Sequence, residues 1–193
     1  LVHECLPHIN FFIEVFPYLQ MIHIQRHPID LSHSWMLRGW GRRFGVDPLA
    51  FIPTIDSDNV PAPWYTEEWK EKYSGLSEID RVIRSVCTLQ KISSQGYDLL
   101  KESQKNQVLI INYEEFFSKP SLIIKKLSNF LNTHPFSNME EVCKREGCPK
   151  EIPLSSRMSK FKELSRQASP NIIRELKKAS EEYEFQWDLE PST

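Results

Sequence analysis

Two short, mostly apolar runs, each closed by polar residues, are the most regular stretches of the chain. They occupy residues 21–25 (MIHIQ) and 108–112 (VLIIN). A strand that is covered on both faces of a sheet is apolar along most of its length, as in parallel sheets. The two runs therefore predict neighbouring or near-neighbouring strands of a parallel α/β sheet with helices on both faces.

Helical periodicity fills much of the remaining chain. Apolar residues recur at three- and four-residue steps from residue 76 to about 101, which predicts a long amphipathic helix. Pro120 and Ser169-Pro170 are typical helix starts, and we expect a helix after each of them. Shorter helices are expected over residues 8–16 and 137–146.

A region rich in proline and aromatic residues, 45–75, interrupts these patterns. Its prolines and large aromatic residues are Pro48, Pro53, Pro61, Pro63, Trp64, Tyr65, Trp69 and Tyr73. This density indicates an ordered insertion rather than a flexible linker, which contains few large apolar groups. Two interpretations stay open: a wall or lid for an acceptor, or a set of aromatic side chains that cap the core.

Length and charge restrict the class of protein. A chain of 193 residues suits one domain, residues 1–193, with a substantial core. A net charge of −2 argues against nucleic-acid binding, which needs a basic surface. No apolar run is long enough to span a membrane, and no secretory signal opens the chain. We therefore expect a cytoplasmic protein, or one of the Golgi lumen if an N-terminal anchor precedes Leu1.

Cysteine and histidine do not form a metal pattern. Four cysteines are too few for a disulfide scaffold. Cys143 and Cys148 can pair in an oxidising compartment, but no other feature indicates secretion, so we expect free thiols. Five of the six histidines lie between residues 3 and 33, without the His and Cys spacing of a zinc site. We expect no bound metal.

Positive charge gathers after the first predicted strand. Arg26 follows its carboxyl end, and His27-Pro28 then turns the chain. Asp30 is the expected N-cap of a helix through Arg38. Ligands bind beyond the carboxyl ends of parallel strands, and helix N-termini attract anions. The arginines of this stretch therefore predict a phosphate or sulfate site: Arg26, Arg38, Arg42 and Arg43. The alternative is that Arg26 is a surface residue paired with Asp30.

Two segments of the chain resemble the sulfotransferase family. The first is Arg26-x-Pro28-x-Asp30 with Ser34 eight residues after the arginine, preceded by Phe16-Pro17. The second is the run Val108–Phe116, similar to the family's strand ending in Tyr-Glu-Asp-Leu. A proline-started helix that closes on Phe130-Leu131 follows it, as in the family. The resemblance covers roughly residues 8–132.

The resemblance implies a P-loop-NTPase-like fold and the donor 3′-phosphoadenosine 5′-phosphosulfate. Arg26 and Ser34 would hold the 3′-phosphate of the donor, and Tyr113 would lie near its adenine or phosphate. The reaction would transfer a sulfuryl group to a hydroxyl or amine of a small-molecule, carbohydrate or peptide acceptor. The acceptor and the oligomeric state cannot be read from the chain.

Other features of the family have no match here. Its donor loop, rich in glycine or serine, does not precede the arginine motif, so we expect a domain that is N-terminally incomplete and inactive alone. No catalytic base is assigned, because the residues around His3, Glu4 and His8 do not match the family's motif. A second basic, hydroxyl-bearing cluster, Ser155, Ser156, Arg157 and Lys160, follows a loop but lacks the family's Arg-Lys-Gly signature.

Two other classes of protein remain open. The chain can be a non-catalytic module that binds a nucleotide or another anion. It can also be a nucleotide kinase-like enzyme of related topology, which needs a phosphate loop and a magnesium-binding acid.

Overall fold

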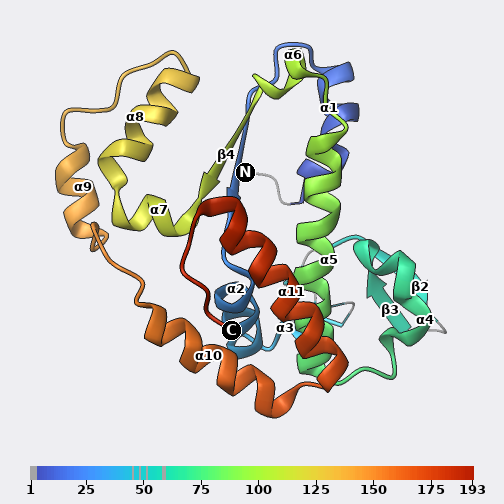
Figure 1. Cartoon of the computed structure of the whole chain (residues 1–193). Helices are drawn as coiled ribbons and strands as arrows, with labels where there is room; N and C mark the ends of the chain where they lie inside the picture. Colours follow the sequence, from blue (N-terminus) through green and yellow to red (C-terminus); the bar gives the residue numbers. More distant parts are fainter. Residues whose placement is uncertain (1–3, 45, 48, 51, 58–59) are drawn as a thin grey trace. The chain divides into compact units, whose positions relative to one another are not determined.

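The computed structural model describes residues 4–44, 46–47, 49–50, 52–57 and 60–193 (Figure 1). The chain separates into two compact units. The first unit comprises Leu1–His27 and Ser93–Pro153, and the second comprises Pro28–Ile92 and Leu154–Thr193. Among the described residues, no helix combines the length and the apolar character that a membrane crossing requires.

A two-stranded parallel sheet forms the centre of the first unit. Strand β1 (Met21–Gln25) pairs with β4 (Val108–Asn112) in a register that runs from Met21 opposite Val108 to Gln25 opposite Asn112 (Figure 1). The predicted strands are therefore confirmed, and so is their parallel adjacency. At this level the fold is α/β, with a small parallel sheet flanked by helices.

Helices flank this sheet within the first unit, while Ile22 and Ile24 on one face of β1 are exposed. These helices are η1 (Leu6–His8), α1 (Ile9–Val15), α6 (Glu102–Lys105), α7 (Tyr113–Ser118), α8 (Pro120–Phe130) and α9 (Met139–Arg145). Val108 of β4 shares a core with buried residues before β1, namely Leu6, Ile9 and Ile13. Helices α6, α7 and α8 contact β4. The predicted helices over 8–16, after Pro120 and over 137–146 are thus confirmed.

Helices make up most of the second unit. They include α2 (Pro28–Leu37), α3 (Trp40–Arg43), α5 (Glu78–Asp98, whose last turns belong to the first unit), α10 (Leu154–Gln167) and α11 (Pro170–Trp187). Helix α2 contacts both α10 and α11. Their shared core consists of Ile29, Ile79, Ile83, Leu164, Ile172 and Leu176. Burial of this apolar stripe fixes the three helices on α5.

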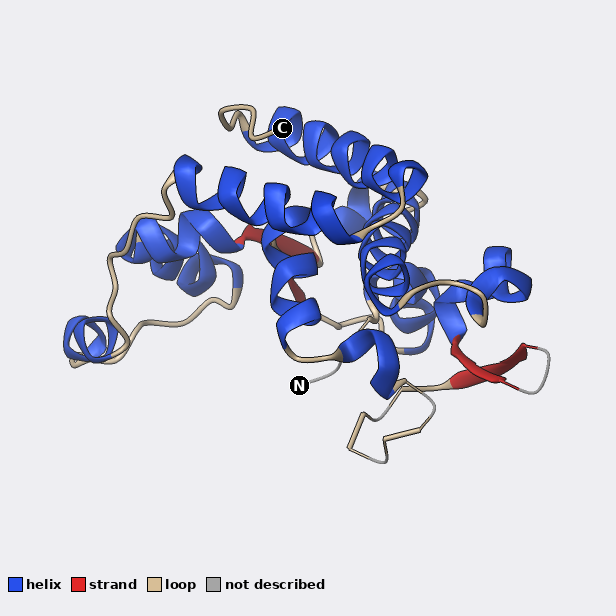
Figure 2. Ribbon diagram, turned by 90° about the horizontal axis from the view of Figure 1, so that it is seen from below, coloured by secondary structure: helices blue, strands red, loops and turns tan. Residues whose placement is uncertain are grey.

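The proline- and aromatic-rich region forms a small layer within the second unit. Strands β2 (Thr54–Ser57) and β3 (Val60–Pro63) pair antiparallel, and η2 (Trp64–Trp69) and α4 (Lys70–Tyr73) follow (Figure 2). Trp69 and Tyr73 are buried against Ala62. These aromatic side chains therefore contribute to a core, as one of the two interpretations expected. Gly45 and Pro48 lie outside the described residues.

One local expectation was wrong. Helix α2 begins at Pro28, so Asp30 lies inside the first turn and is not the N-cap. Proline suits this position, since its fixed φ matches a helix and its missing N–H is not needed there. Strand β4 ends at Asn112, whose side chain accepts a hydrogen bond from the Glu115 amide and begins α7. The strand therefore has its predicted bounds, and Tyr113 is the first residue of α7.

Gly41 allows α3 to approach the first residue of α5. A Cβ atom at this position would lie 2.0 Å from the Glu78 carbonyl oxygen, which is backbone and cannot move aside. We expect Gly41→Ala to lower the free energy of unfolding by about 1–3 kcal/mol, the usual cost of overpacking. Urea denaturation followed by circular dichroism measures it.

Gly75→Ala is the matched control, because its nearest neighbour would be 3.8 Å from the new Cβ and the site is exposed. Equal losses for the two variants would contradict the close approach at Gly41.

Candidate anion-binding site

The parallel pairing of β1 and β4 places Arg26 beside Tyr113. Gln25 lies opposite Asn112, so the next residues of the two strands emerge together at the carboxyl edge of the sheet. The guanidinium carbon of Arg26 lies 4.7 Å from the centroid of the Tyr113 ring. The Phe117 ring, one turn along α7, is 4.6 Å from that of Tyr113. The arginine is therefore held by a cation–π contact on a supported aromatic ring.

Arg26 keeps unused hydrogen-bonding capacity. Its Nε atom is buried, and no described residue accepts a hydrogen bond from it. The residue as a whole is half-buried. Buried donors in native proteins are almost always paired, and an unpaired one needs an explanation such as a missing ion. The geometry suits an oxyanion, because a guanidinium offers parallel N–H groups to two oxygens.

A buried carboxylate fixes the backbone that follows Arg26. The backbone N–H of His27 donates to Glu114 Oε1 at 3.1 Å, and both residues are buried. Glu114 therefore ties the segment after β1 to the first turn of α7. It was not among the residues predicted for the site. The available signal was a pair of acids, Glu114 and Glu115, directly after a buried strand.

The structure brings together two of the three predicted donor-binding residues, Arg26 and Tyr113. Ser34 lies on α2, in the second unit, and is half-buried. Within the described part of the chain, its hydroxyl makes no hydrogen bond. That hydroxyl is therefore available to a ligand.

Asp30 forms a buried ion cluster with α10. Its side chain is 1% exposed and accepts from Arg157 Nε at 3.0 Å and from Lys160 Nζ at 2.5 Å. The predicted basic cluster thus lies on a helix, and its two cations already have a partner. The alternative pairing of Asp30 with Arg26 does not occur.

The pKa of Asp30 reflects this cluster. Burial raises the pKa of the carboxyl, but the hydrogen bonds and charges of Lys160 and Arg157 outweigh burial and bring it below its ordinary value. Asp30 is therefore ionised at neutral pH.

The other arginines of the predicted cluster are differently placed. Arg43 Nε donates to Asp47 at 2.6 Å, and its guanidinium carbon lies 4.1 Å from the Trp40 ring centroid. Arg38 and Arg42 are exposed. Of the four arginines, Arg26 alone combines a buried, unpaired nitrogen with an aromatic support among the described residues.

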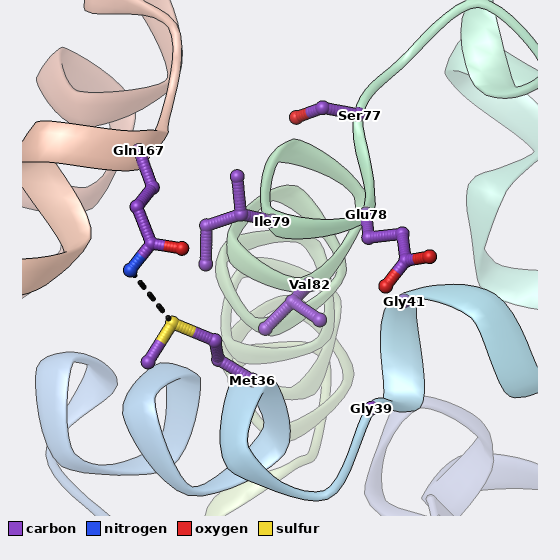
Figure 3. Close-up of a pocket in the computed structure, with 8 residues that line it drawn as sticks. All are labelled: Met36, Gly39, Gly41, Ser77, Glu78, Ile79, Val82 and Gln167. Atoms are coloured by element: carbon purple, nitrogen blue, oxygen red, sulfur yellow. Dashed lines mark hydrogen bonds between the residues drawn. The ribbon is translucent and has the colours of Figure 1, made fainter.

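A pocket of about 340 Å³ opens within the second unit (Figure 3). It is lined by the end of α2, by α3, by the start of α5 and by Gln167 of α10. Gln167 Nε2 lies 3.6 Å from Met36 Sδ across one side of it. None of Arg26, Ser34 or Tyr113 lines this pocket.

No metal centre emerges from the described residues, because none of their His, Cys, Asp and Glu side chains gather in threes. His23 of β1 is half-buried, and burial lowers its pKa to about 4, so it is neutral at pH 7. His3 lies outside the described residues.

Comparison of the chain with protein-family models, curated proteins and solved structures finds no match.

Removing the charge of Asp30 would leave Arg157 buried without its partner. We expect Asp30→Asn to lower the free energy of unfolding at pH 7 by about 3–5 kcal/mol. Because the folded-state pKa lies below the ordinary 3.8, the stabilisation is complete above that value and disappears as the pH falls through the folded-state pKa. Urea denaturation between pH 7 and pH 2 should therefore show the variant and the wild type converging in acid.

Asp47→Asn is the control, since this half-buried carboxylate also pairs with an arginine but remains in contact with solvent, and it should change stability little. If Asp47→Asn lowered the free energy of unfolding as much as Asp30→Asn, the burial of Asp30 would not explain its effect on stability.

Burial of His23 predicts a second pH dependence, at higher pH. In the unfolded chain His23 has its ordinary pKa of 6.5, whereas in the folded protein its pKa is about 4, so it takes up a proton only at lower pH. Stability is thus complete above 6.5 and falls as the pH drops towards 4, by at most about 3 kcal/mol. His23→Gln should flatten this slope in thermal denaturation, while exposed His134→Gln should leave it unchanged. An unchanged slope in His23→Gln would refute the assignment.

Proposed function

We propose that this protein is a sulfotransferase that uses 3′-phosphoadenosine 5′-phosphosulfate and transfers its sulfuryl group to a hydroxyl or amine. The observation that carries the proposal is the buried, unpaired Nε of Arg26 beside Tyr113, at the carboxyl edge of a parallel sheet. In open α/β sheets this edge is where ligands bind. The motif Arg26-x-Pro28-x-Asp30 with Ser34 supports the same assignment.

Arg26 would bind the 3′-phosphate of the donor. Its planar fork matches two phosphate oxygens, and each charge-assisted hydrogen bond contributes about 1.5–3 kcal/mol. Tyr113 restrains the guanidinium before the ligand arrives, which reduces the entropy lost on binding. Ser34 belongs to the second unit, and its assignment to the donor phosphate comes from the sequence motif alone.

The contribution of these residues to the reaction is positional. In-line transfer of a sulfuryl group requires the acceptor oxygen or nitrogen to face the sulfur as the bisphosphate leaves. Holding the 3′-phosphate at a fixed point aims the rest of the donor, while the charge of Arg26 steadies the departing bisphosphate. The base that deprotonates the acceptor and the acceptor itself are not assigned.

The acids of the site favour this proposal over a nucleotide kinase-like enzyme. A magnesium-dependent kinase needs carboxylates that reach the metal at the phosphates. Asp30 is buried and bound by Arg157 and Lys160, and Glu114 accepts from the His27 backbone. Glu115, the third acid near the strand ends, pairs with Lys126 Nζ at 3.3 Å. All three acids are therefore engaged with groups of the protein.

We expect adenosine 3′,5′-bisphosphate to bind the protein and Arg26→Ala to weaken that binding by about 2–4 kcal/mol, because a charged bidentate contact is lost. Arg26→Lys should lose part of this, since it keeps the charge without the fork. Ser34→Ala should cost about 1 kcal/mol. Calorimetric titration of each variant, with adenosine 5′-phosphate as the ligand lacking the 3′-phosphate, measures these losses.

Arg166→Ala, which removes an exposed arginine, is the matched control and should leave binding unchanged. Equal losses for both nucleotides would mean that Arg26 supports the fold rather than the 3′-phosphate. No loss for either would refute the site. Robust sulfuryl transfer from labelled donor by residues 1–193 alone would contradict the expectation that this domain is inactive without the donor loop.

A further inference from the structure

The end of α9 brings Cys143 and Cys148 together through the backbone. The Cys148 N–H donates to the Cys143 carbonyl at 2.8 Å, and the Gly147 N–H donates to the Lys144 carbonyl at 3.0 Å. Gly147 has φ 74°, the left-handed conformation. These are the two hydrogen bonds and the glycine of the Schellman motif, in which the side chains at the two outer positions are usually in contact. Here both outer positions are cysteines.

The distance between the two backbones suits a disulfide. With a hydrogen bond of 2.8 Å from N to O, standard bond lengths hold the two Cα atoms at most ~6.7 Å apart. Cysteines joined by a disulfide have Cα atoms about 4.4–6.8 Å apart. The backbone hydrogen bond therefore keeps the two Cα atoms within the reach of a disulfide.

The four cysteines differ in their surroundings, and none of them is part of a disulfide. Cys143 is half-buried and Cys148 is buried beside it. Cys87 lies in the core of the second unit, where burial raises its pKa to about 12 and makes it unreactive. Cys5 is far from the other three in sequence and belongs to a different element. Only Cys143 and Cys148 are joined by a described backbone hydrogen bond.

We propose that Cys143 and Cys148 form a reversible intramolecular disulfide, with a low-molecular-weight disulfide such as oxidised glutathione as the oxidant. The Cys143 thiolate attacks one sulfur of the small disulfide, forms a mixed disulfide and releases one small thiol. The Cys148 thiolate then attacks the Cys143 sulfur and releases the second. The pair loses two electrons and two protons in total, and the small disulfide is reduced to two thiols.

The crosslink would fix the end of α9 and the segment after it. Two residues beyond Cys148, the Lys150 N–H donates to the Phe117 carbonyl of α7 at 2.8 Å. The segment after α9 is thus already held at Lys150 by α7, and the disulfide would hold it at Cys148 as well. The amides of the last turn of α9 should exchange with solvent more slowly in the oxidised protein.

Treatment of the native protein with oxidised glutathione, followed by alkylation and mass spectrometry, tests this site. We expect one linked peptide containing Cys143 and Cys148, about 2 Da lighter than the reduced form and restored by dithiothreitol. Cys5 and Cys87 should remain available to alkylation after unfolding. In Cys148→Ser, the glutathione adduct on Cys143 should persist, because the second thiol is absent.

Gly147 supplies a matched pair of variants. Gly147→Asn tolerates the left-handed conformation and should close the disulfide at nearly the wild-type rate, whereas Gly147→Val resists it and should close at least about tenfold more slowly. Equal rates for both variants would overturn the role of the Schellman motif. Persistent glutathione adducts on the wild type, or linkage between separate copies on a non-reducing gel, would overturn the disulfide itself.

Discussion

The parallel register of β1 with β4 is the constraint on which the candidate site depends. Main-chain hydrogen bonds set Gln25 opposite Asn112, and a shift of one residue would turn every side chain of a strand to the other face. Arg26 and Tyr113 meet because they follow these two paired residues. Glu114 then secures the adjoining backbone by accepting from His27. Positions 87 residues apart in the sequence are thereby joined by backbone pairing, before any ligand contributes.

Two cationic groups of the molecule illustrate how burial and pairing separate a binding site from a structural cluster. Arg157 is buried and pairs with Asp30, so its attraction to this carboxylate offsets the cost of removing the guanidinium from water. The guanidinium is therefore engaged within the protein. Arg26 has only an aromatic ring beneath it and keeps a buried donor unpaired. An aromatic face holds a guanidinium in place without consuming its N–H groups. These arginines therefore differ in the chemistry of their partners as well as in their exposure.

The sequence by itself determined the elements whose signal is local. Both strands were predicted from short, mostly apolar runs. Helices α5, α8 and α11 were predicted from apolar periodicity, with proline at the start of two of them. The expectation that Arg26 follows a strand end also came from local pattern. Helix α10 was not predicted, because its residues are mostly polar and only Arg157 and Leu164 of this helix are buried. The start of α2 was predicted too late in the chain, because Pro28 and Asp30 are both typical of helix starts and the sequence does not choose between them.

Only the tertiary structure decided which charged groups meet. The sequence placed Asp30 near Arg26, but the fold pairs it with Arg157 and Lys160, more than a hundred residues away. The fold also places the Tyr113 ring against Arg26. It buries the aromatic side chains of Tyr65, Trp69 and Tyr73. Hydrophobic patterns and helix starts are set by neighbours along the chain, which the sequence displays directly. Ion pairs and aromatic contacts depend on distances of a few ångströms between remote segments, and these distances exist only once the chain has folded.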